Sequence, residues 1–96
     1  MIKSISVSSL NKLNAINIVD IRSVEKYNSS HINGALNIPI NELIRYPGKY
    51  FNKKDIYYIY CQRGIQSIKL CSILQDLGYN VVNVNGGYEA WILHEV

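Results

Sequence analysis

Residues 55–78 decide the fold, and they read DIYYIYCQRGIQSIKLCSILQDLG. The segment 55–60 is a nearly continuous β-forming run, which is typical of a strand buried on both faces of a parallel sheet. Further along, apolar residues recur at helical spacing on a stripe made of Ile68, Leu70, Cys71, Ile73, Leu74 and Leu77. Gly78 follows, where a helix commonly ends. The stretch therefore predicts a strand, a tight turn and a helix.

The rest of the chain repeats this alternation. Further strands are predicted at residues 2–7, 16–21, 35–36 and 81–84. Short helices are predicted at 8–13 and 23–29, each opened by a serine that can cap it, at 41–45, and after Gly86-Gly87, where Tyr88, Trp91 and Ile92 repeat at helical spacing. A turn is expected at Pro47-Gly48. Strands that alternate with helices predict an α/β fold with a mostly parallel sheet, whose ligands bind beyond the carboxyl ends of the strands.

The size of the chain favours one domain. Its 96 residues are 48% hydrophobic and 18% charged, which is the composition of a globular protein with a single core. We therefore expect one domain over residues 1–96. Because a chain of this length has little room for an enclosed pocket, any active site should be shallow.

Charge and cysteine usage exclude several classes of protein. The formal net charge is +3, but the Lys and Arg residues are scattered, so nucleic acid is not an expected partner. No window resembles a membrane span, and the N-terminus MIKSISVSSL lacks the apolar core of a secretory leader. Only two cysteines are present, whereas small secreted scaffolds carry several disulfides. We expect free thiols and a cytoplasmic location.

Cys61 stands where the predicted strand ends and the turn begins. Successive N–H groups of such a turn can form a nest for an anion, and the helix that follows adds the positive end of its dipole. Arg63 adds a full positive charge. Cysteines in such surroundings are largely thiolate at neutral pH, so Cys61 is a candidate nucleophile.

A buried cysteine can also be purely structural. The turn after Cys61 argues against that reading, since it contains Gly64, the polar residues Gln62 and Gln66, and Ser67, which we expect to cap the helix. Cys71 is the opposite case, because it lies on the apolar stripe and is expected in the core.

Three segments resemble the signatures of rhodanese-like sulfurtransferases. Residues 60–67 (YCQRGIQS) resemble the active-site loop of that family. Residues 20–22 (DIR), Tyr27 and residues 31–39 (HINGALNIP) are similar to its N-terminal signature, and residues 86–91 (GGYEAW) to its C-terminal one. The segments occur in the family's order and extend over most of the chain.

The resemblance implies a five-stranded parallel sheet flanked by helices and a Cys61 that cycles between thiol and persulfide. Cys61 would take sulfur from a donor such as thiosulfate and pass it to a thiol or cyanide, by covalent catalysis in two transfers. Residues 62–67, which are Gln62, Arg63, Gly64, Ile65, Gln66 and Ser67, would form the substrate cradle. No metal or organic cofactor is expected. The expected partners are a small sulfur-containing anion or thiol, or a protein that donates or accepts sulfur.

Two positions in the loop refine this hypothesis. Cysteine phosphatases of related fold place an arginine six positions after the cysteine to bind phosphate, and here that position is Ser67. Phosphatase and arsenate reductase chemistry are therefore not expected.

Many rhodanese-like proteins also carry a basic residue immediately before the closing serine, where this chain has Gln66. Its absence should weaken thiosulfate binding unless Arg63 compensates.

Other polar residues near the predicted site have two possible roles. Arg22 could add positive potential for the substrate, or it could order the next turn through Asp20 and Glu25. His31 is assigned to the scaffold rather than to activation of Cys61, His94 to the surface, and Tyr88 and Trp91 to the core. Gly86-Gly87 predicts a turn with positive φ that could form the far wall of the cleft.

Two other functions remain open from the sequence. The chain could be a rhodanese-fold module that binds a protein or relays sulfur with little small-molecule activity. An intact Cys61 favours the enzyme over this alternative. A redox role for Cys61 is a third possibility, but no resolving cysteine stands two or three residues away.

Overall fold

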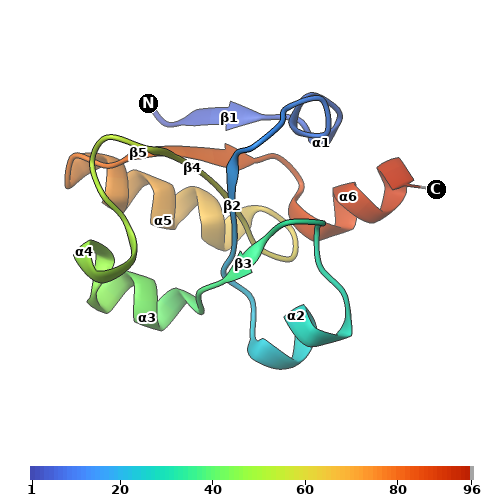
Figure 1. Cartoon of the computed structure of the whole chain (residues 1–96), viewed down its shortest axis with the longest axis horizontal. Coiled ribbons are helices and arrows are strands. Elements are labelled where there is room, and N and C mark those ends of the chain that lie inside the picture. Colours follow the sequence, from blue (N-terminus) through green and yellow to red (C-terminus); the bar gives the residue numbers. More distant parts are fainter. Residues whose placement is uncertain (96) are drawn as a thin grey trace.

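The structure is a computed structural model that describes residues 1–95, with side chains through residue 94. Its strands are β1 (Lys3–Ile5), β2 (Asn17–Asp20), β3 (Leu36–Asn37), β4 (Ile56–Tyr60) and β5 (Asn80–Val84). Its helices are α1 (Val7–Leu10), α2 (Val24–Ser29), α3 (Ile40–Arg45), α4 (Pro47–Tyr50), α5 (Ile65–Asp76) and α6 (Gly87–Glu95). This α/β arrangement, shown in Figure 1, confirms the fold class expected from the sequence.

The strands form one sheet in the order β1-β5-β4-β2-β3, and neighbouring strands are parallel. The register places Asp20 of β2 opposite Tyr60 of β4, and Ile59 of β4 opposite Asn83 of β5. The carboxyl ends of the three central strands therefore meet at one edge, and the functional residues are positioned there.

Two apolar clusters cover the two faces of the sheet. On one face, Leu43 of α3 and Leu70, Cys71 and Leu74 of α5 pack against strand residues such as Ile59. The other face is covered by α1 and α6 through Leu10, Tyr88 and Trp91, which pack with Tyr60 and Val84. The central strands are thus enclosed at their carboxyl ends, which accounts for their apolar sequences.

The apolar stripe predicted for α5 is partly wrong. Ile68, Ile73 and Leu77 are about half exposed, whereas the buried residues of the helix are Ser67, Leu70, Cys71 and Leu74. The buried face is therefore turned toward positions 67, 70, 71 and 74, and a polar residue lies on it. Spacing alone could not reveal this rotation, because apolar residues occur on both faces of the helix.

Two other local expectations need correction. The first helix spans Val7–Leu10 and is capped by Ser6, whose side chain accepts from the N–H of Ser9, so it begins before the predicted Ser8. The Pro47-Gly48 segment is the start of α4 rather than only a turn. In contrast, Ser23 caps α2 as predicted, accepting from the N–H of Lys26.

Candidate active site

Cys61 follows the last residue of β4 directly, and only 3% of its surface is exposed. The backbone N–H of Gly64 donates to its Sγ at 3.1 Å, and that of Ser67 at 3.4 Å. Gly64 adopts φ +92°, a left-handed conformation that favours glycine and turns the chain back over the sulfur. The loop is thus a nest of N–H groups centred on Sγ, where negative charge is stabilised.

Ser67 is not the cap of α5, in contrast to the sequence prediction. The helix already begins at Ile65 with Gly64 as its cap residue, and Ser67 lies fully buried in the first turn. Its hydroxyl accepts from the Cys61 thiol at 3.4 Å and donates to Oδ1 of Asn83 at 2.5 Å. The serine therefore links the sulfur to a buried side chain of β5.

The loop is supported from behind by the start of α6. The N–H of Tyr88 donates to the carbonyl of Cys61 at 2.9 Å, and the N–H of Glu89 to that of Gln62 at 3.0 Å. Gly86 and Gly87 adopt φ +75° and +60°, as the turn prediction required. A Cβ on Gly87 would overlap the carbonyl oxygen of Cys61. The glycine turn thus packs against the back of the loop, and it does not form the far wall of the cleft.

Arg22 is part of a buried polar network beside the loop. Its guanidinium pairs with the fully buried carboxylate of Asp20 at 2.8 Å, and the hydroxyl of Tyr60 donates to the same carboxylate at 2.6 Å. Burial opposes the charge on Arg22, but Asp20 outweighs it and raises the pKa of the guanidinium. Burial and the bond to Asp20 raise the pKa of Tyr60, which stays neutral.

The same guanidinium reaches the loop from the other side. Its Nη1 donates to Oε1 of Gln62 at 3.2 Å, and Tyr88 covers its face with a ring centroid 4.1 Å from Cζ. Asp20, rather than Glu25, is its salt-bridge partner. Arg22 thus orders the turn after β2, and its contact with Gln62 also connects it to the loop.

Two adjoining cavities open at this edge of the sheet. One, of about 390 Å³, is lined by Lys26, Cys61, Gln62, Arg63, Ile65 and Gln66. The other, of about 400 Å³, is lined by Ile21, Arg22, Ser23, Lys26, Pro39, Ile40, Asn41, Gln62 and Gln66. We call them the sulfur cavity and the side groove. They share the lining residues Lys26, Gln62 and Gln66, so they lie next to each other.

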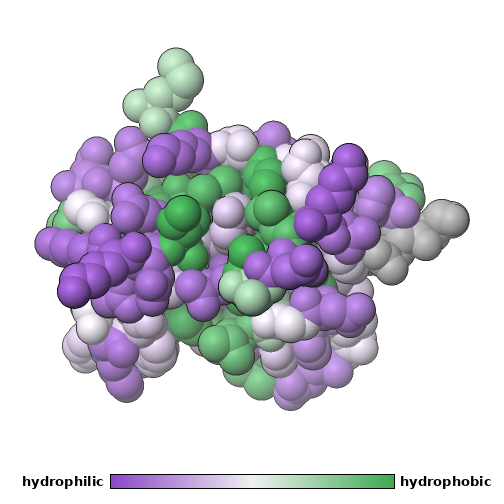
Figure 2. Space-filling view, turned by 45° about the horizontal axis from the view of Figure 1, so that its top comes forward, coloured by the Kyte–Doolittle hydropathy of each residue, from purple (hydrophilic) through white to green (hydrophobic). Residues whose placement is uncertain are grey.

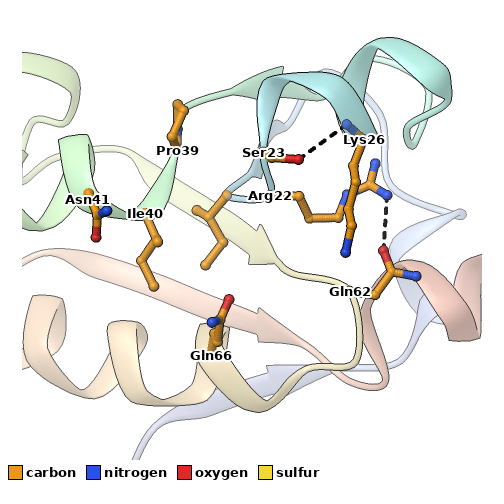
Figure 3. A pocket seen from close by; sticks show the side chains of 9 residues that line it. Arg22, Ser23, Lys26, Pro39, Ile40, Asn41, Gln62 and Gln66 are labelled. Atoms are coloured by element: carbon orange, nitrogen blue, oxygen red, sulfur yellow. Dashed lines mark hydrogen bonds between the residues drawn. The ribbon is translucent and has the colours of Figure 1, made fainter.

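Among the side chains that the structure describes, the charged residues that line these cavities are all basic. Arg22 is paired with buried Asp20, and Arg63 makes an exposed pair with Glu89 at 3.3 Å. Lys26 has no salt-bridge partner among the described side chains. In Figure 3 its side chain runs along the groove toward Gln62. A small anion near Cys61 therefore meets an ammonium group that is free to pair with it.

The structure brings most of the predicted site residues together. Cys61, Gln62, Arg63, Ile65 and Gln66 line the sulfur cavity, and the N–H groups of Gly64 and Ser67 lie beneath the sulfur. Arg22 lines the adjoining groove instead. The sulfur is buried at the base of an open cavity, in agreement with the expected shallow site.

Residues assigned to the scaffold make no hydrogen bond to the sulfur of Cys61. The ring of His31 stacks on Tyr27 with centroids 3.8 Å apart, and its Nδ1 is 2.8 Å from the carbonyl oxygen of Tyr27. Cys71 is fully buried, and burial raises the pKa of its thiol to about 12. Tyr88 and Trp91 belong to the core and His94 is exposed, as predicted.

Two residues near the site were missed by sequence reasoning. Lys26 carries no motif, and only its position on the helix after β2, at the same sheet edge as Cys61, could have indicated it. Asn83 lies within an apolar strand and is fully buried. A lone asparagine in a predicted core strand was the available signal, since a buried amide requires a partner.

Among the side chains that the structure describes, no group of three or more His, Cys, Asp or Glu residues is arranged to hold a metal ion. No helix within the described part of the chain has the length and apolar character needed to span a membrane.

Comparisons with known proteins agree with this geometry. The thiosulfate sulfurtransferase PspE of Escherichia coli (strain K12) is 37% identical over 70 residues, which cover 72% of this chain and 67% of that protein. The putative sulfur carrier protein YrkF of Bacillus subtilis (strain 168) is 32% identical over 78 residues, 80% of this chain and 42% of that one. A crystal structure of a rhodanese-like domain protein from Staphylococcus aureus superposes with a TM-score of 0.85 and 36% identity, covering 94% of this chain and 91% of the other.

Some other curated relatives are much longer, and the chain spans only 20% of their length. The similarity is nevertheless continuous along this sequence. A family model described as the rhodanese-like domain matches residues 6–94, which include the strand, the loop and the glycine turn that surround Cys61. The chain therefore belongs to the rhodanese-like domain family, and rhodanese-type sulfur transfer is the role that its relatives support.

Proposed function

We propose that this protein is a sulfurtransferase that carries sulfur as a persulfide on Cys61. The observation that carries the proposal is the pair of N–H groups, from Gly64 and Ser67, that donate to Sγ. These groups can stabilise negative charge that develops on the sulfur during the reaction, and the cavity above provides space for a small donor. A thiolate held in this way is a nucleophile that needs no neighbouring base.

The first half-reaction loads the cysteine. The Cys61 thiolate attacks the outer sulfur of thiosulfate, a new S–S bond forms, and the bond between the two sulfur atoms of thiosulfate breaks. The electrons of that bond leave with sulfite, so charge and atoms balance. Lys26 and Arg63 are placed to attract the anionic donor, while Gln62 and Gln66 offer amide groups at the cavity wall.

The second half-reaction unloads it. A thiolate or cyanide attacks the outer sulfur of the persulfide, and the electrons of the broken S–S bond return to Cys61. The N–H groups of Gly64 and Ser67 support the thiolate that leaves. Arg22 acts indirectly, by keeping Gln62 in place through the 3.2 Å hydrogen bond.

A sulfur-relay module is the second candidate, and the similarity to the putative sulfur carrier YrkF favours it. In that case Cys61 would still form a persulfide, but a protein would supply or accept the sulfur. Exposed Ile65 at the rim of the sulfur cavity would suit such a partner. The two candidates differ in turnover with small molecules and not in the chemistry at Cys61.

The test is an intact-mass measurement after incubation with thiosulfate. We expect the protein to gain the mass of one sulfur atom, to lose it on addition of cyanide, and to gain nothing in Cys61→Ser. Cys71→Ser is the matched control, because its sulfur is buried in the core, and it should still gain one sulfur. A wild-type mass that never changes with thiosulfate or with an organic persulfide would rule out sulfur transfer through Cys61.

A further inference from the structure

Ser67 and Asn83 form a buried polar pair beside the sulfur of Cys61. Hydrophilic side chains cover much of the face that Figure 2 shows, but four polar or charged residues are buried in the described part of the chain. Two of them, Asp20 and Arg22, form the ion pair beside the loop. The other two, Ser67 and Asn83, are fully buried and share a hydrogen bond of 2.5 Å. This second pair has the closer contact with the reactive atom.

The hydrogen bonds of Ser67 determine where its single proton lies. A hydroxyl has one proton to donate, whereas the carbonyl oxygen of an amide can only accept. The Ser67 hydroxyl donates to Oδ1 of Asn83. The Nδ2 group of Asn83 donates instead to Oδ1 of exposed Asn85, at 3.4 Å. The proton of Ser67 therefore lies between Ser67 and Asn83, and its oxygen presents a lone pair to Cys61.

This arrangement suits the thiol of Cys61 better than the thiolate. The thiol S–H donates to Oγ of Ser67 at 3.4 Å, so the protonated sulfur has a partner. When this proton leaves to solvent, the thiolate faces an oxygen lone pair at that contact rather than a donor. The backbone N–H groups of Gly64 and Ser67 still donate to the sulfur. The backbone of the loop and the hydroxyl of Ser67 thus act in opposite directions on the charge of Cys61.

We propose that Asn83 is a positioning residue that holds the Ser67 hydroxyl proton away from Cys61 and so opposes formation of the thiolate. This inference rests on the proposed function, because the thiolate is the species that attacks the donor in the first half-reaction. Without the Asn83 carbonyl, the Ser67 hydroxyl would be free to donate to the charged sulfur. Removal of this buried amide should therefore make Cys61 react faster, whereas a purely structural role predicts no gain.

Several titratable or charged side chains lie around the loop that holds Cys61, and the test leaves all of them in place. They are Asp20 of β2 with Arg22 after it, Lys26 of α2, Tyr60 of β4, Arg63 of the loop, Cys71 of α5 and Glu89 of α6. The strand β5 has no titratable side chain. Within the described residues, none of these groups forms a hydrogen bond with the side chain of Ser67 or Asn83. A substitution at Asn83 therefore changes the hydrogen bonding of Ser67 and keeps the surrounding charges constant.

The test is a double-mutant cycle read by alkylation of Cys61. Iodoacetamide is neutral, so the basic side chains at the cavity do not attract it, and peptide masses separate Cys61 from Cys71. Rates are measured from pH ~6 to ~10 for the wild type, Asn83→Leu, Ser67→Ala and the double variant. On the rising part of the profile, Asn83→Leu should raise the rate about three- to tenfold, the equivalent of one net hydrogen bond. The plateau at high pH should change little.

The Ser67→Ala background and three further variants serve as controls. Asn83→Leu should give no increase when Ser67 is alanine, because no hydroxyl proton is then available to release. Asn80→Leu makes the same change at the exposed start of β5, and Ser72→Ala shortens an exposed serine of α5, so both should keep the wild-type profile. Should Asn83→Leu fail to fold, Asn83→Val also removes the carbonyl and matches the neighbouring valines of the strand, and it should raise the rate in the same direction.

The outcomes distinguish the role of Asn83 from the proposed function. Unchanged or slower alkylation in the folded Asn83 variants overturns the role of Asn83. An equal increase in the Ser67→Ala background overturns it too, since the effect would not pass through the hydroxyl. An increase that persists at the high-pH plateau indicates better access to the sulfur and likewise contradicts the proposal. A wild-type protein that shows the alkylation pattern but never loads sulfur from thiosulfate or an organic persulfide overturns the proposed function alone.

Discussion

At Cys61 the reactive atom is surrounded by groups from three different elements. The loop supplies the N–H of Gly64, α5 supplies the N–H of Ser67, and β5 reaches the sulfur through the pair of Ser67 and Asn83. Backbone N–H groups do not titrate, so they remain hydrogen-bond donors over the whole pH range in which the protein works. This arrangement distinguishes the site from a cysteine–histidine couple, in which activation depends on imidazole.

Lys26 is the residue whose removal should most directly weaken donor binding. We expect Lys26→Met to raise the KM for thiosulfate about two- to fivefold, the effect of one exposed ion pair worth up to about 1 kcal/mol. The rate of persulfide loss to cyanide should change less, because cyanide carries less charge at neutral pH. Steady-state kinetics at low and high salt measure this effect, and added salt should reduce it.

Lys12→Met provides the control for that measurement. Lys12 is exposed and lines neither the sulfur cavity nor the side groove, so it changes net charge by the same amount at another place. Equal kinetics for the two variants would show that only the overall charge matters. In that case Lys26 has no specific part in binding the donor.

At the scale of elements, α6 and its glycine turn hold the active-site loop in place. The first N–H groups of α6 have no partners within their own helix and donate instead to the carbonyls of Cys61 and Gln62. This contact requires the turn to approach the loop closely, and Gly87 provides that approach because it has no Cβ. Residues 86–91, which resemble the C-terminal signature of the family, thus support the active-site loop and do not line the sulfur cavity.

Gly87→Ala should disturb both stability and sulfur loading. The new methyl group would overlap the carbonyl oxygen of Cys61 and push the loop away from α6. We expect a loss of more than about 2 kcal/mol in unfolding free energy, since strain and overpacking add, together with slower persulfide formation. Urea unfolding and the mass assay measure the two effects.

Gly34→Ala separates backbone strain from the clash. Gly34 also has a positive φ, +85°, but a Cβ there would meet nothing within 4 Å. This variant should lose about 1–2 kcal/mol and load sulfur at the normal rate. Normal sulfur loading in Gly87→Ala would contradict the supporting role assigned to α6.

The elements themselves differ in how well the sequence predicts them. The strand before Cys61 and the helix after it could be predicted, because a β-rich run and a helical repeat stand on either side of a glycine-containing turn. The start of α5 could not, since Ser67 is a common capping residue and its burial depends on Asn83, which is distant in sequence. Lys26 was missed for the same reason, because only the folded sheet brings α2 to Cys61.

At the scale of the whole molecule, Cys71 gives stability a dependence on alkaline pH. Burial, and then the nearby Cys61, raises the pKa of Cys71 from 9.0 to about 12, so the folded protein keeps a proton that the unfolded chain releases. A group whose pKa is raised by folding makes its full contribution to stability at pH values below its pKa in the unfolded chain. For Cys71 this contribution is lost as pH rises from 9.0 toward 12.

The wild-type protein should therefore lose stability faster than Cys71→Ala in this interval. The difference in slope should approach about 1.4 kcal/mol per pH unit, the value for one proton. Urea unfolding from pH ~8 to ~10 measures it while limiting other alkaline titrations. Tyr60 is present in both proteins, so its own raised pKa cancels in the comparison. Parallel stability curves would mean that the thiol ionises equally in the folded and unfolded states.

The strand order affects how readily two molecules associate through the edges of their sheets. The two outermost strands are also the shortest, since β3 has two residues and β1 has three, while the central strands have four or five. A sheet edge with so few unpaired backbone groups offers little template to another chain. Concentrated protein should therefore resist edge-to-edge aggregation.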